Sequence, residues 1–89
     1  MIKQKIIIIN KLGLHARAAA KLVHLASRFE SESQLVRGNK MVNGKSIMGV
    51  MMLAASKGTE IELLVDGPDE SIAMKSICDL INNRFGESE

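Results

Sequence analysis

Aromatic residues are scarce in this sequence of 89 residues, which contains two Phe and no Trp or Tyr. Domains that bind single-stranded nucleic acid stack the bases on exposed aromatic side chains. The formal net charge is +2, which is too small to indicate a surface for nucleic-acid phosphates. We therefore expect no nucleic-acid partner, and a hydrophobic core built from Ile, Leu, Val, Met and Ala.

Cysteine and long apolar runs are also lacking. Cys78 is the only cysteine, so no internal disulfide can form, and a reducing cytoplasmic setting fits this composition. We expect Cys78 to be a small core or boundary residue rather than a nucleophile. The apolar run of residues 6–9 ends at Asn10 and is too short for a signal peptide or a membrane span. The sequence thus predicts a cytoplasmic protein with no direct membrane insertion.

Histidine occurs only twice, as His15 and His24, and no cysteine lies near either of them in the sequence. A zinc site needs three or four nitrogen, sulfur or carboxylate ligands brought close together. We therefore expect no metal site.

The spacing of the apolar residues predicts four strands and three helices, because it alternates in some segments and has a helical period in others. The expected strands are 6–9, two short runs on either side of the Gly38-Asn39 turn, and 59–66. The expected helices are 16–27, 47 to about 53, and one that begins at the 67–69 turn. The order β-α-β-β-α-β-α predicts one α+β domain, residues 1–89, whose helices cover one face of the sheet. We expect Lys57-Gly58 to mark the exit of the second helix, Gly86 to end the last, and the tail 87–89 to be frayed.

His15 stands directly before ARAAAKL, a segment of high helix propensity, and so occupies or adjoins an N-cap. The unpaired backbone N–H groups of Ala16, Arg17 and Ala18, with the positive end of the helix dipole, would form an anion site there. The same field disfavours imidazolium and favours a neutral, nucleophilic ring. The Arg17 guanidinium could hold phosphate oxygens through forked hydrogen bonds. The alternative is that His15 is simply a polar surface residue at a helix start.

Ser46 precedes the second expected helix, and two interpretations of it stay open. Serine is a common N-cap, so its role can be purely structural. It can also be a modification site, because a phosphate at a helix N-terminus is stabilised by the helix dipole.

Methionines are concentrated in the second expected helix. We expect Met52 and Leu53 to pack in the core and Ile47, Met48 and Met51 to be exposed. Methionine surfaces adapt to partners of different shape. We therefore predict that the exposed three form a docking patch together with Leu14 and Arg17.

Two segments, NKLGLHARAAAKLV and GKSIMGVMMLAASKGTEIEL, resemble the two signatures of HPr, the histidine-containing phosphocarrier family of the sugar phosphotransferase system. The resemblance runs from the first strand to Phe85 and implies an open-faced sandwich of three helices over a four-stranded antiparallel sheet. It also implies that His15 is phosphorylated on Nδ1, that Arg17 contacts the phosphoryl group, and that Ser46 is modified by a dedicated kinase/phosphorylase. Ala18 departs from the proline that many members have there, and it keeps one more N–H donor.

The function that the resemblance implies is phosphoryl transfer from phospho-enzyme I to His15 and onward to enzyme IIA domains in sugar uptake. Such a carrier has no cofactor of its own, and we expect a monomer. The alternative is a nitrogen-type regulatory phosphorelay carrier that uses the same His15 chemistry. A binding module such as an RNA-binding domain would need exposed aromatics and a stronger basic face. A stand-alone enzyme would need an acid and a base beside His15, and the sequence shows no such set.

Overall fold

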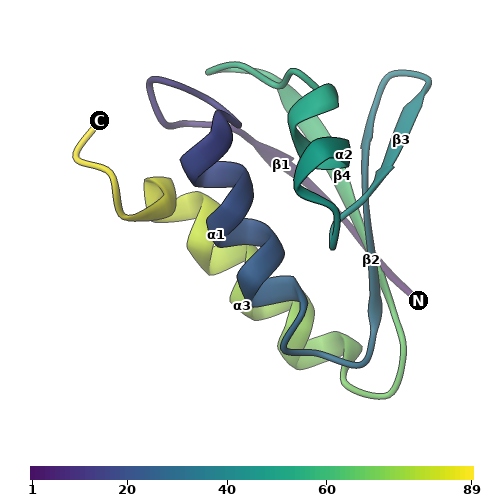
Figure 1. The fold of residues 1–89 in the computed structure, drawn as a ribbon. Coiled ribbons are helices and arrows are strands. Elements are labelled where there is room, and N and C mark those ends of the chain that lie inside the picture. The colour runs from purple at the N-terminus through teal and green to yellow at the C-terminus, as the bar shows by residue number, and fades with distance from the viewer.

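Four strands and three α-helices make up the fold, and the computed structural model describes residues 1–89 (Figure 1). In chain order the elements are β1 (Ile2–Ile7), α1 (Ala16–Ala26), β2 (Glu32–Arg37), β3 (Lys40–Asn43), α2 (Ile47–Met52), β4 (Glu60–Asp66), α3 (Glu70–Asn82) and a short 3₁₀ turn, η1 (Arg84–Gly86). This is the predicted order, and the α+β class is confirmed. None of the helices has both the length and the apolar character needed to cross a membrane.

The sheet has the strand order β1-β4-β2-β3, and every neighbouring pair is antiparallel. Side chains alternate between the two faces of a strand, and along β4 the buried ones are Ile61, Leu63 and Val65. Ile61 lies opposite Ile6 of β1, and Leu63 lies opposite Leu35 of β2. These buried side chains form the sheet half of the core, and the helices lie on that side (Figure 1).

Helices α1 and α3 run side by side over the sheet (Figure 1). Each of these helices buries an apolar stripe at helical spacing, with Leu22 on α1 and Ile77 on α3 both fully buried. Complete burial of a side chain of this size contributes about 1.5–3 kcal/mol to folding. Three of the four buried residues of α1 are alanines, so this helix brings little side-chain bulk to the core.

Two element boundaries differ from the sequence prediction. Strand β1 begins at Ile2, four residues before the expected start, because Ile2 pairs with Val65 at the far end of β4. Helix α2 ends one residue before its predicted end at about residue 53, but Lys57-Gly58 does not mark its exit. It ends at Met52, and Ala54 takes the left-handed conformation with φ 54°. The guanidinium of Arg37 donates hydrogen bonds to the carbonyls of residues 53 and 54. These bonds give partners to carbonyl groups at the C-terminal end of this short helix.

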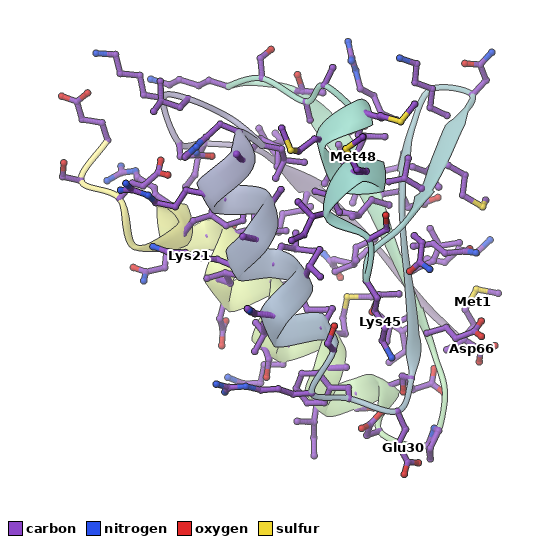
Figure 2. The ribbon with its side chains drawn as sticks, viewed as in Figure 1. Met1, Lys21, Glu30, Lys45, Met48 and Asp66 are labelled. Carbon is purple, nitrogen blue, oxygen red and sulfur yellow. The ribbon has the colours of Figure 1, made fainter.

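The C-terminal segment is held in place, so the prediction of a frayed tail is wrong. Phe85 is fully buried even though its φ is 54°, and Lys21 of α1 donates to the Phe85 carbonyl at 2.6 Å. Figure 2 shows Lys21 reaching from α1 toward this segment. Further along, the Lys11 N–H donates to the Glu89 carbonyl at 3.0 Å. The C-terminal residues therefore lie against the loop that precedes α1, at the N-terminal end of that helix (Figure 1).

Candidate functional site

His15 is the N-cap residue of α1, as the sequence predicts. Its backbone is extended, with φ −74° and ψ 177°, and its carbonyl accepts the first helical hydrogen bond from Ala19 at 2.8 Å. Its side chain makes no capping hydrogen bond, so the ring is free for other contacts. The side chain is about a quarter exposed, at 27%. The ring is thus fixed in position by the helix start and still reachable from solvent.

The loop before His15 is tightly constrained. Gly13 has φ 65°, and a Cβ at this position would lie 2.5 Å from the carbonyl oxygen of Ala55. Only glycine adopts that conformation at no cost and fits that space. The next residue, Leu14, donates its N–H to the same Ala55 carbonyl at 2.9 Å. The segment after α2 therefore sets the position of the histidine.

The first turn of α1 offers unpaired backbone donors. The N–H groups of Ala16, Arg17 and Ala18 make no hydrogen bond within the protein. Ala16 and Arg17 are exposed, whereas Ala18 is fully buried against the core, so two of the three predicted N–H donors face solvent. Arg17 takes part in none of the five ion pairs, so its guanidinium is available to a ligand. Unpaired N–H groups at a helix N-terminus together with a free cation form a binding site for an anion.

Glu87 contacts His15 from the C-terminal segment. Its Oε2 lies 2.5 Å from Nε2 of the His15 ring, and its Oε1 accepts a hydrogen bond of 3.0 Å from Nδ2 of Asn10. Asn10 is fully buried, and the same Nδ2 also donates to the Gly13 carbonyl at 2.9 Å. The hydrogen bond from Asn10, and after it that from His15, lowers the pKa of the Glu87 carboxyl, while burial opposes this. The histidine therefore has an ionised carboxylate at one of its two ring nitrogens.

Sequence reasoning missed both Asn10 and Glu87. Glu87 lies 72 positions after His15 and 77 after Asn10, in a tail expected to be frayed. The RFGE segment that carries it shows no helical or strand periodicity. The available signal was Phe85, since a large apolar residue near the end of a chain favours docking of that end against the core.

A shallow hollow opens at this point of the surface. It is lined by Lys11, Leu12, His15, Ala16, Arg17, Glu87, Ser88 and Glu89. Lys11 pairs with Glu89 across one side of the hollow at 3.2 Å. The hollow thus holds the imidazole, one unpaired guanidinium, the Lys11 ammonium and two paired carboxylates, and this charged lining is suited to a small polar ligand rather than to a large apolar one.

Helix α2, which contacts α1, presents an apolar surface to solvent. Ile47, Met48 and Met51 are exposed, as predicted, and Figure 2 shows Met48 on this helix. Met52 was expected in the core and is instead 69% exposed. The helix turns Val50 and Leu53, three positions apart, toward the core, which leaves Met52 outside.

Leu14 does not belong to this exposed surface, contrary to the prediction. It is 5% exposed and is part of the hydrophobic core, because its N–H is tied to Ala55 beneath the loop. Leu12, two residues earlier, is 66% exposed. We therefore define the apolar α2 surface as Ile47, Met48, Met51 and Met52.

Ser46 is the N-cap of α2. Its Oγ accepts a hydrogen bond from the Gly49 N–H at 3.1 Å, and the residue is partly exposed. The structural interpretation of this serine is thus confirmed. Because the side chain stays partly exposed next to Ile47, the geometry also leaves room for a modification.

Cys78 does not line the hollow that holds His15. Cys78 is half-buried, its Sγ lies 3.6 Å from the sulfur of Met74, and burial raises the pKa of its thiol. No group of three or more His, Cys, Asp or Glu side chains lies close enough together to hold a metal ion.

Several known proteins resemble this chain in sequence and in fold. The family described as the PTS HPr component phosphorylation site matches residues 2–83. The phosphocarrier protein HPr of Neisseria meningitidis serogroup A is 61% identical over 89 residues, which is the full length of both chains. The crystal structure of HPr-C-His from Thermoanaerobacter tengcongensis is 47% identical and superimposes with a TM-score of 0.96 over all of both chains. A structure of an HPr dimer from the same organism is 48% identical, with a TM-score of 0.78 over 98% of this chain and all of that one.

Proposed function

The chain belongs to the HPr family of phosphocarriers of the phosphotransferase system, and from that membership we propose that His15 is the residue that carries the phosphoryl group. It receives the group from phospho-enzyme I and passes it to enzyme IIA domains in sugar uptake. The observation that carries this proposal is the position of His15, whose partly exposed ring lies at a helix N-terminus with three unpaired N–H groups.

In the proposed reaction, the lone pair of Nδ1 attacks the phosphorus of the phosphoryl group on the donor enzyme. A new N–P bond forms at His15 while the N–P bond of the donor breaks, and its electron pair stays on the donor nitrogen. Charge on the phosphoryl oxygens is stabilised by the Arg17 side chain and by the exposed N–H groups of Ala16 and Arg17. The protein contributes positioning and electrostatics, without a cofactor of its own.

The apolar α2 surface is the proposed docking site for these partner proteins. It lies beside the helix that carries His15, so a partner seated on it would bring its own active site to the ring. Methionine side chains repack against surfaces of different shape, which suits a carrier that meets a donor and several acceptors in turn. Contacts of this kind are modest in area and short-lived.

Phosphorylation of Ser46 is the proposed means of regulation. The phosphate would stand at the start of α2 and add a charge of about −1.5 to −2 next to Ile47. A new charge at an apolar interface opposes docking because it must lose its hydration. Since a helix N-terminus favours negative charge, we expect the modified protein to stay folded while enzyme I binds it more weakly.

We further propose that the protein acts in the cytoplasm as a monomer. The proposed carrier must expose His15 to each partner, which a closed assembly over α1 and α2 would prevent. The dimer of the Thermoanaerobacter tengcongensis protein makes this a point to test, by sedimentation analysis at several protein concentrations. A mass that doubles at low concentration would contradict the monomer.

The test of the carrier function is mass spectrometry after incubation with enzyme I and phosphoenolpyruvate. We expect one acid-labile phosphoryl group, located on a peptide containing His15, which is lost on addition of an enzyme IIA domain. His15→Ala should remain unmodified, and His24→Ala, a change of the other histidine on the same helix, should be modified as the wild type is. An unmodified wild-type protein in the presence of an enzyme I that phosphorylates another HPr would overturn the proposal.

A further inference from the structure

Glu87 is placed to control the protonation of the His15 ring. A neutral imidazole carries its proton on one nitrogen and a lone pair on the other, and the hydrogen bond at one nitrogen decides which tautomer is present. An ionised carboxylate can only accept a hydrogen bond. The pKa of Glu87 is lowered, so its carboxylate is ionised at neutral pH and the short contact requires the proton on Nε2.

We propose that Glu87 is a positioning residue that holds His15 in the Nε2–H tautomer and so leaves the lone pair on Nδ1, the nitrogen that reacts. The proposal deepens the proposed function and rests on it. The same arrangement of carboxylate and imidazole orients the ring in other sites where a histidine must present one chosen nitrogen.

The carboxylate is itself held in place, which is what a positioning role requires. Its second oxygen is bound by Asn10, whose Nδ2 is fixed by the Gly13 carbonyl in the interior. The chain on its N-terminal side is anchored by the buried ring of Phe85. Glu87 therefore cannot leave His15 without giving up contacts to the loop that carries the histidine.

A further effect is expected during transfer. When Nδ1 bonds to phosphorus, its lone pair is used and positive charge develops on the ring, while the proton stays on Nε2. The Glu87 carboxylate faces that proton and stabilises the charge. Lys11, Lys21 and Arg17 are the cations around the carboxylate, and Glu89 is the other anion.

The first test reads the tautomer directly and needs no partner protein. The ¹⁵N chemical shifts of the His15 ring, recorded at a pH of about 8, above the ordinary imidazole pKa of about 6.5, distinguish a protonated from an unprotonated nitrogen. We expect the wild type to have the proton on Nε2. Glu87→Ala should move both shifts toward the averaged values of His24, an exposed histidine in the same spectrum. A wild-type ring protonated on Nδ1, or on both nitrogens, would overturn the proposal.

The second test measures the rate of phosphorylation by enzyme I. Loss of a carboxylate that orients a metal-ligating histidine typically costs about 10–100-fold, and since Glu87 holds the His15 ring in the same manner we expect at least a tenfold slower reaction for Glu87→Ala. Glu87→Gln keeps a hydrogen-bond acceptor without the charge and should fall between that variant and the wild type. It also covers the case in which the alanine variant does not fold. Asp79→Asn, a change of an exposed carboxylate that pairs with Lys75 on α3 and does not line the hollow, is the matched control and should react as the wild type does.

The outcomes separate this proposal from the one on which it rests. If Glu87→Ala reacts as fast as the wild type or faster, the carboxylate does not assist His15, although His15 can still be the carrier. If the wild type is not phosphorylated on His15 at all, the carrier function fails whatever the tautomer is.

Discussion

Replacing Phe85 with Ala tests whether one buried ring anchors the C-terminal segment to the domain. Phe85 is fully buried, and it is one of only two aromatic residues. Truncating a fully buried Phe to Ala costs about 3–5 kcal/mol, a large part of the about 5–15 kcal/mol by which a small domain is stable. Each kcal/mol shifts the Tm of a domain of this size by about 4–8 °C, so we expect Tm to fall by about 12 to 40 °C.

The substitution isolates the ring because both residues carry a Cβ. The backbone cost of the left-handed conformation at φ 54° is thus nearly the same before and after the change. Unfolding in urea should be followed by circular dichroism, since the chain has no Trp or Tyr for fluorescence. Phe29→Ala, at the other and only half-buried aromatic, is the matched control and should lose less stability. A loss below about 1 kcal/mol, or one equal to that of the control, would refute the anchoring argument.

Three further predictions concern the loops and the helix caps. Gly13→Ala should lower the free energy of unfolding by more than about 1 kcal/mol, because its Cβ would collide with the Ala55 carbonyl, and urea titration measures this. The hydrogen bond from the Ser31 hydroxyl, more than any other contact, lowers the pKa of Asp69 below its unfolded value. This carboxylate therefore stabilises the fold at pH values above its unfolded pKa, and the stabilisation is lost as the pH falls through its folded pKa. Unfolding measured from pH 7 to pH 2 should show that loss in the wild type and a flatter profile in Asp69→Asn. Ser46→Ala should cost about 1 kcal/mol through the lost cap, whereas Ser46→Asp should keep the stability and weaken binding of enzyme I in calorimetry. An aspartate variant that binds as the wild type does would count against regulation at this serine.

The local features of the fold were predictable from the sequence. Helix α1 begins after His15 because an alanine-rich segment with helical periodicity follows it, and Ser46 caps α2 through a hydrogen bond to a residue three positions away. The strand β4 alternates in burial as its sequence does. Each of these depends on neighbours within one or two turns of chain, and such interactions are visible in a single sequence.

The remaining features depend on contacts between distant segments. The start of β1 at Ile2 is not apparent from the sequence, because it depends on the pairing of Ile2 with Val65 of β4. The burial of Leu14 and the exposure of Met52 do not follow from the sequence. Burial of a loop residue, or of one face of a six-residue helix, depends on which segments pack against it. The contact of Glu87 with His15 joins residues 72 positions apart, and no periodicity in the sequence indicates it.

The central position of β4 in the sheet has a consequence for how the chain acquires its structure. Strands β1 and β2 are joined only through β4, which ends at residue 66. During synthesis, β1 thus has no hydrogen-bonded neighbour until most of the chain has been made, and pairings over such long sequence separations form slowly. Its isoleucines stay open to other apolar surfaces in that interval, which makes the nascent chain prone to aggregate. Folding of this carrier should accordingly begin with the β2-β3 hairpin, whose strands are separated only by Gly38 and Asn39, and β1 should join last.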